Sequence, residues 1–109
     1  METLYLTRNL KIEPNEIMYL ESESNYTLIY TTNKSKTITS QTLHVVHSSI
    51  NYDNFLRISR KHIINIEHIS TIYLEKNRLT FKLSNGEKFI ASRRRTKDCL
   101  DRVKFISFT

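Results

Sequence analysis

The sequence predicts a mainly β fold with one or two short helices, and three observations support this prediction. Along most of the chain, apolar and β-branched residues alternate with polar ones, which is the period of a strand that buries one face. Short polar turns separate these segments, and the strongest is Asn85–Gly86, whose residues tolerate the positive φ of a type I′ hairpin turn. Apolar residues follow helical spacing in only two short stretches.

The expected strands are short and lie in both halves of the chain. Residues 25–32 are rich in β-branched and aromatic side chains, a polar turn follows, and residues 37–39 return from it. Later in the chain, Leu79, Phe81 and Leu83 alternate with polar residues, so one face of that strand is buried and the other is solvated. The strands expected in the second half are 71–75, 78–83 and 88–91, with turns at Lys76–Asn77 and Asn85–Gly86 between them.

Two short helices are expected to interrupt this pattern. The first spans residues 41–49, with Ser40 as its N-cap. The second starts near Thr96, with Asp98 in its first turn. Neither helix carries a dense basic face, so we expect no helix-turn-helix with a recognition helix. The inward-facing residues are expected to be Leu43, Val46 and Ile50 in the first helix and Leu100 and Val103 in the second.

Length and composition indicate one domain over residues 1–109. The 39% hydrophobic content of the 109 residues suits a single globular core. The single cysteine, Cys99, excludes an internal disulfide framework and is expected to be a small buried hydrophobe. No apolar run approaches the ~18 residues of a membrane span, and the first residues lack the features of a signal peptide. We therefore expect a cytoplasmic protein that does not enter a membrane.

The positive charge is confined to the second half of the chain. Residues 1–52 hold 4 basic and 5 acidic residues, a net charge of −1, whereas residues 53–109 hold 13 basic and 6 acidic residues, a net charge of +7. Two basic clusters, Arg60–Lys61 and Arg93–Arg95, each follow an apolar segment. Such asymmetry is typical of a nucleic-acid-binding domain and less often of a protein that binds anionic membranes. A merely solvated basic surface is the simplest alternative.

The sequence offers no constellation for catalysis or metal binding. His44 and His47 are spaced to share one helix face, but no further ligand has compatible spacing, so a surface pair is expected rather than a metal site. Glu21 and Glu23 alternate on one strand face without a pocket or partner that would favour acid–base chemistry. There is no glycine-rich phosphate loop. We therefore expect neither an enzyme nor a bound cofactor.

Four segments, taken in order, resemble the LytTR family of DNA-binding domains. The second of them is similar to the family's central F-x-R-(V/I)-H-R-S signature, and the last two are similar to its closing hairpin and S-R motif. The likeness extends from about Leu4 to Val103. The four segments are Ile17–Ser22 with Asn25–Thr27, Phe55–Ile58 with His62–Ile69, Leu83–Gly86, and Ala91–Arg94.

The resemblance implies an elongated β-sandwich of about ten short strands without a helix-turn-helix. Family members are bacterial transcription regulators that bind direct repeats in double-stranded DNA and insert loops into successive major grooves. Most are output domains of two-component response regulators, which implies an N-terminal receiver domain and a sensor kinase. The domain alone is then expected to be a monomer, with two copies on direct-repeat DNA.

Three DNA-contacting loops are implied when the family's motifs are matched to this chain. Asn25 and Tyr26 match the first loop, and Arg60 and Lys61 match the second. This chain departs from the family pattern at Ser59, Lys61 and His62, which affects the base preference expected of the second loop. The third loop is implied by Arg93, Arg94 and Arg95, with Lys97 following.

The chemistry of these side chains suggests a division of roles. An arginine fork can bond both O6 and N7 of guanine, and we expect Arg94 to read a base in this way. Arg57 is expected to form a structural pair or a phosphate contact, and Asn65 to fix the turn before Ile66. The alternative function is a basic, β-rich adaptor that binds a protein or an anionic membrane surface. The residues expected to hold the DNA backbone are Lys61, Arg93, Arg95 and Lys97.

Overall fold

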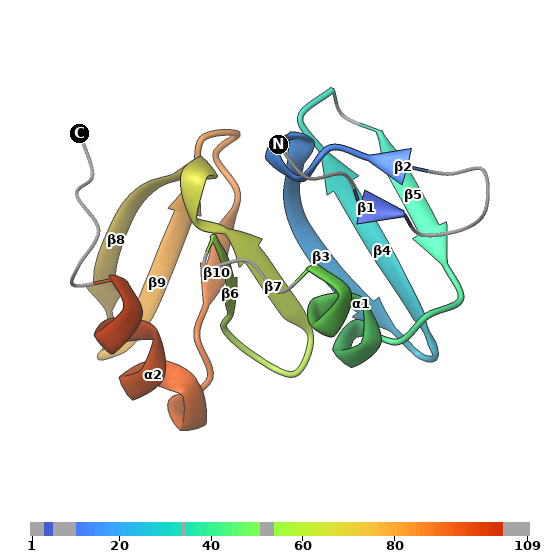
Figure 1. Cartoon of the computed structure of the whole chain (residues 1–109). Coiled ribbons are helices and arrows are strands. Elements are labelled where there is room, and N and C mark those ends of the chain that lie inside the picture. The colour runs from blue at the N-terminus through green and yellow to red at the C-terminus, as the bar shows by residue number, and fades with distance from the viewer. Residues whose placement is uncertain (1–3, 6–10, 34, 51–53, 104–109) are drawn as a thin grey trace.

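The computed structural model describes residues 4–5, 11–33, 35–50 and 54–103. This part of the chain forms ten short strands, two α-helices and two 3-10 helices, in agreement with the expected mainly β fold (Figure 1). The helices are η1 (Pro14–Glu16), α1 (Leu43–Ile50), η2 (Ile66–His68) and α2 (Arg93–Val103). The strands are β1 (Leu4–Tyr5), β2 (Lys11–Ile12), β3 (Ile17–Glu23), β4 (Tyr26–Thr31), β5 (Lys36–Thr39), β6 (Phe55–Arg57), β7 (His62–Asn65), β8 (Ile69–Glu75), β9 (Arg78–Leu83) and β10 (Lys88–Ile90).

All strand pairs in the described residues are antiparallel and form two larger sheets and one small one. The larger sheets have the orders β5-β4-β3-β7-β6 and β10-β9-β8, and β1 pairs with β2 alone. Figure 1 shows the two larger sheets arranged along the length of the molecule, with α1 against the first and α2 at the far side of β6 and β7. The principal extents, 42 × 29 × 22 Å, confirm the elongated shape.

Two hydrophobic clusters hold these layers, and β3 contributes to both. Leu20 packs on one side of the five-stranded sheet with α1, whereas its neighbour Tyr19 packs on the other side against the three-stranded sheet. Successive side chains of a strand point to opposite faces, so one strand serves both clusters. Ile17 belongs to the cluster of Leu20 and Met18 to that of Tyr19, across a register shift between Ile17 and Tyr19, so all four residues are buried.

In β9, Leu79, Phe81 and Leu83 are buried and Lys82 is exposed, as predicted, but Thr80 is buried too, which contradicts its predicted solvated position. The hairpin turns also differ from the prediction. Of the two residues Asn85–Gly86, only Gly86 has a positive φ (93°), so this is not a type I′ turn. Gly86 N donates to Leu83 O at 2.9 Å and Leu83 N donates to Glu87 O at 2.9 Å, which forms a three-residue loop with a glycine bulge. The type I′ pattern occurs instead at Lys76–Asn77, where φ is 52° and 64°.

The first helix starts two residues later than predicted. Thr42, not Ser40, is the N-cap, since its Oγ1 accepts from Val45 N at 3.4 Å and its carbonyl accepts from Val46 N at 3.0 Å. Leu43 and Val46 are buried, as predicted. The reason for the shift is that β5 continues to Thr39, which leaves residues 40–42 to form the connection.

The second helix starts earlier than predicted, at Arg93 rather than near Thr96, so Asp98 does not lie in its first turn. Cys99 and Val103 are buried as expected, but Leu100 is 45% exposed, which contradicts its predicted inward orientation. Cys99 and Val103 are four positions apart, as helical spacing requires, whereas Leu100 is rotated by about 100° from Cys99. Five strands lie between α1 and α2, and the described residues contain no helix-turn-helix. No helix in this part of the chain is both long and apolar enough to cross a bilayer.

Asn65 has the structural role that the sequence predicted. Its Oδ1 accepts from Glu67 N at 3.0 Å and so caps η2, while its Nδ2 donates to Ile17 O at 2.8 Å. The side chain is 1% exposed, so the amide satisfies backbone groups of β3 and of the η2 turn inside the protein.

We expect Asn65→Ala to lower the free energy of unfolding by roughly 2–3 kcal/mol, because it leaves buried backbone groups without partners. Urea denaturation followed by circular dichroism would measure this. Asn85→Ala is the matched control: its Oδ1 also accepts from the amide two residues on, at Glu87, but the site is exposed. The control is expected to cost less than about 1 kcal/mol. Equal losses in both variants would contradict the structural role of Asn65.

Candidate nucleic-acid interface

Three loops distant in sequence meet at one edge of the molecule. The first is the β3–β4 turn (22–25), the second connects β6 and β7 (58–61), and the third joins β10 to the first turn of α2 (91–94); together we name them the three-loop surface. Lys61 O accepts from Ser22 N and Ile58 O accepts from Ser92 N, each at 2.8 Å. Two backbone hydrogen bonds therefore place the loops in a row, which Figure 1 shows along the lower edge.

The first loop is a tight turn whose tip faces solvent. Ser24 has a positive φ of 54°, and the pairing of Glu23 with Tyr26 closes the turn. Asn25 is exposed, and Tyr26 is 52% exposed although it begins a strand. The structure thus brings both predicted residues to the tip of the first loop.

The second loop is fixed by side chains within and beside it. Ser59 Oγ accepts from Lys61 N at 3.2 Å and from His62 N at 3.0 Å. Arg57 donates from Nε to Ser59 O at 3.1 Å and from Nη2 to Arg60 O at 3.2 Å. The expectation of a structural role for Arg57 is therefore confirmed. Sequence reasoning identified Ser59 only as a departure from the family pattern, whereas here it organises the turn.

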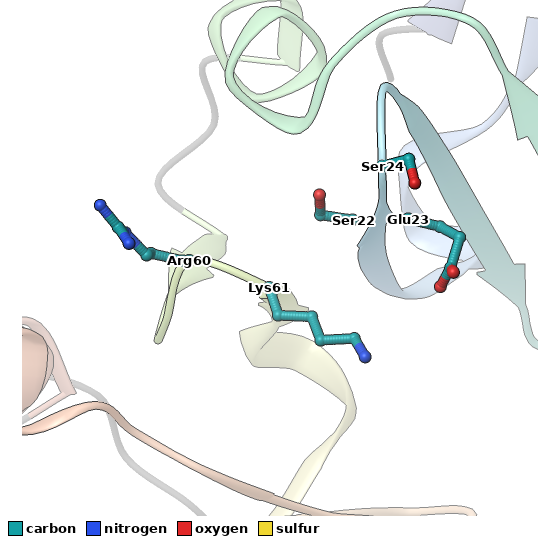
Figure 2. Close-up of a pocket in the computed structure, with 5 residues that line it drawn as sticks. All are labelled: Ser22, Glu23, Ser24, Arg60 and Lys61. Carbon is teal, nitrogen blue, oxygen red and sulfur yellow. The ribbon is translucent and has the colours of Figure 1, made fainter.

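Arg60 and Lys61 are left exposed by this arrangement. Figure 2 shows their side chains pointing in opposite directions from the second loop. Together with Ser22, Glu23 and Ser24 of the first loop they line an open depression of about 330 Å³. Two cations thus extend from a rigid loop toward solvent, next to the tip of the first loop.

The arginine cluster of the third loop, Arg93–Arg95, lies in the first turn of α2 and not, as predicted, in a loop after a strand. Arg95 N donates to Ser92 O at 3.1 Å, which closes that turn. Arg93, Arg94 and Lys97 are exposed and share one side of the helix by their spacing of three and four residues. Cations in a first helical turn oppose the helix dipole, so a nearby anion would stabilise them.

Arg95 is separated from its two neighbours by the helical geometry. It is only partly exposed and lines a cleft with residues of α1 and β6. Of the eight residues predicted to contact DNA, seven therefore point from the three-loop surface or the exposed side of α2, and Arg95 lies to one side.

Behind the first two loops, Glu21 and His62 form a hydrogen-bonded pair that the sequence did not indicate. His62 Nε2 lies 2.8 Å from Glu21 Oε1, and the two residues are register partners on β3 and β7. The His62 ring also packs edge-on against Phe89 of β10, with centroids 4.8 Å apart. The sequence suggested that Glu21 has no partner, but in the structure its carboxylate contacts His62. A sequence-based prediction that β3 pairs with β7 would have placed Glu21 opposite His62 and so revealed this contact.

The other chemical candidates have ordinary environments. The described residues contain no group of three or more potential metal-ligating side chains, and on α1 His44 is exposed while His47 is partly buried. Burial raises the pKa of the Cys99 thiol to about 11, with the nearby Arg95 opposing this, and the sulfur donates to Arg57 O at 3.7 Å. Cys99 thus fixes α2 against β6 and supplies no reactive thiolate.

Comparisons with known proteins agree with this geometry. The family model described as the LytTr DNA-binding domain matches residues 7–104. A solved structure named as the LytTr DNA-binding domain of a methyl-accepting/DNA response regulator from Bacillus cereus aligns with a TM-score of 0.79. It is 22% identical in sequence and covers 94% of each chain, which shows that the two share a fold. A search of curated proteins found no significant match.

We expect Arg57→Met to loosen the second loop, since methionine keeps the aliphatic stem but donates to neither loop carbonyl. The amides of Lys61 and His62 should then exchange with solvent about tenfold faster, because local opening becomes easier. Hydrogen exchange followed by NMR would measure this. Lys82→Met, on an exposed position of β9, is the control and should leave both amides unchanged. Unchanged exchange in Arg57→Met would show that the two hydrogen bonds do not hold the loop.

Proposed function

We propose that this chain, which belongs to the LytTr DNA-binding domain family, recognises specific sequences in double-stranded DNA through its three-loop surface. The observation that carries the proposal is the pair of backbone hydrogen bonds, from Ser22 to Lys61 and from Ser92 to Ile58, that holds the three loops in one row. A surface arranged before binding loses little conformational entropy on contact, which favours affinity and specificity.

The proposed contacts follow from the position and chemistry of each side chain. Arg94 reads guanine through its two-pronged fork, while Lys61, Arg93 and Lys97 neutralise phosphates. Asn25 and Tyr26 enter at the first loop, where an amide can pair with adenine and a phenol can donate to a phosphate. The long axis of 42 Å supports a footprint of about one turn of B-DNA, ~34–36 Å, as insertion into successive major grooves requires.

In the full regulator we propose that this domain is the transcriptional output of a two-component system in the cytoplasm. The named origin of the Bacillus cereus domain, a response regulator, supports this assignment. A receiver domain phosphorylated by a sensor kinase would then control binding, and the domain alone would be a monomer. Two copies would occupy direct repeats in the operator, with no chemical step, cofactor or membrane involved.

Salt and sequence dependence distinguish this proposal from a basic adaptor that binds a protein or an anionic membrane. A duplex selected from a random pool should bind ~10³-fold or more tightly than random duplex, and affinity should fall steeply with salt. An adaptor would bind all duplexes equally, or none. Fluorescence anisotropy over a salt series, beside sedimentation with anionic vesicles, would measure both.

Arg94→Ala is expected to weaken binding to the selected duplex by roughly 1–3 kcal/mol and to relax preference at one base pair. Repeating the selection with the variant would reveal that position. Lys82→Ala removes an exposed cation from β9, away from the three-loop surface, and should keep the original preference. An unchanged ranking of sequences in Arg94→Ala would exclude this residue from base recognition.

Lys61→Ala is expected to weaken binding to every duplex alike, because a lysine contacts phosphate as a point charge. The plot of log affinity against log salt should become shallower by about 0.9 for the lost phosphate contact. Anisotropy titrations at several salt concentrations would show this. A change in base preference without a change in salt slope would instead assign Lys61 to a base.

A further inference from the structure

A cationic cleft lies beside the three-loop surface, between the two α-helices. It encloses about 360 Å³, with Leu56 of β6 buried among its walls. Figure 1 shows α1 and α2 flanking β6 and β7 near the lower edge of the molecule. The charged and titratable residues that line it are His47 from α1, Arg57 from β6, and Arg95, Asp98, Asp101 and Arg102 from α2.

The cleft carries an excess of positive charge. Three guanidinium groups face two carboxylates, which leaves a net charge of +1 with His47 neutral and +2 with His47 protonated. Among the described residues no carboxylate lies within ion-pair distance of Arg95, although Asp98 is one turn away on the same helix. The cations around the cleft are held in place: Arg102 Nη1 donates to Phe55 O at 3.1 Å, and Arg57 donates to the second loop.

The pKa of His47 reflects its burial and the positive charge of the cleft. Burial lowers its pKa below the ordinary value, the charge of Arg57 lowers it further, and Arg102 and Arg95 act in the same direction. A hydrogen bond to the backbone of Phe55 opposes these effects. Asp98 and Asp101 line the same cleft and offset two of the three guanidinium charges. The cleft therefore has room, net charge and fixed donors for one singly charged anion.

We propose that this cleft binds one phosphodiester of the duplex backbone, with Arg95 as the main contact and His47 as a second, proton-dependent one. The proposal rests on the function proposed above and extends the DNA interface to a site outside the three loops. Arg57 connects the two, because the guanidinium that lines the cleft also holds the carbonyls of Ser59 and Arg60. A phosphate in the cleft would thus lie directly beside the second loop.

The proposal predicts that binding is coupled to protonation of His47. A bound phosphate adds negative charge and raises the pKa of His47 above its value in the free protein. The complex then holds more protons than the free components, so affinity rises as pH falls through the interval between the two pKa values. Other histidines add their own pH dependence, so only the part removed with His47 tests the cleft.

The experiment measures binding of the selected duplex by anisotropy at about pH 8 and about pH 6, across a salt series. Arg95→Gln should weaken binding to all duplexes about tenfold and reduce the salt slope by about 0.9, whereas Arg95→Lys should retain most affinity. His47→Gln should lose part of the gain in affinity that the wild type shows between pH 8 and pH 6. His44→Gln, exposed on the same helix, is the matched control and should keep that gain. Thermal unfolding would confirm that each variant folds.

Duplexes with single methylphosphonate linkages, which are neutral, would identify the phosphate. One linkage should weaken binding of the wild type about tenfold but leave binding of Arg95→Gln unchanged, since both changes remove the same contact. If wild type prefers the selected duplex while Arg95→Gln and His47→Gln match it at both pH values, the cleft proposal is overturned and the proposed function stands. If wild type prefers no duplex, both fail. If inorganic phosphate alone shifts the NMR signals of His47 and Arg95, and every methylphosphonate duplex binds normally, the site belongs to free phosphate and its DNA assignment is overturned.

Discussion

The packing of Phe89 against Tyr19 and His62 is the interaction on which the rest of the interface depends. The first two loops extend from the five-stranded sheet, whereas the third follows β10 of the other sheet. The ring of Phe89 lies 4.7 Å from that of Tyr19 and 4.8 Å from that of His62. Tyr19 also stacks on Tyr30 at 4.3 Å, and its pKa is raised by burial and by a hydrogen bond to Glu87 on the β9–β10 hairpin. These contacts join the sheets, so they also set the position of the third loop relative to the other two.

The loops beside this contact between the sheets are rigid because their polar groups are hydrogen-bonded inside the protein. The second loop would otherwise expose carbonyls and amides that compete for ligand contacts, but Arg57 and Ser59 take up four of them. The side chains of Arg60 and Lys61 take no part in these four hydrogen bonds and are exposed to solvent. Hydrogen bonding within the loop thereby separates the residues that build it from those that can contact DNA.

Sequence patterns predicted the sheet better than they predicted the interface. Strands such as β9 were readable because Leu79, Phe81 and Leu83 alternate with polar residues, and this period depends only on local geometry. The start of α2 was not readable, since three consecutive arginines lack a helical apolar pattern and Ser92 closes the first turn through its backbone carbonyl. Contacts between distant segments, such as Glu21 with His62 or α1 with α2 across the cleft, depend on strand order and packing, which no local pattern encodes.

The residue at which α2 begins determines which of the three arginines face outward and which faces the cleft. Successive helical residues are rotated by about 100°, so Arg93 and Arg94 face outward while Arg95 faces the cleft beside Arg57. Without an anion, this crowding of cations at a positive helix end destabilises the first turn of α2. A polyanion bound beside this turn would remove the repulsion and strengthen the turn. The free protein therefore retains an unfavourable charge arrangement that would become favourable beside an anion, a pattern expected where residues are selected for binding rather than for stability.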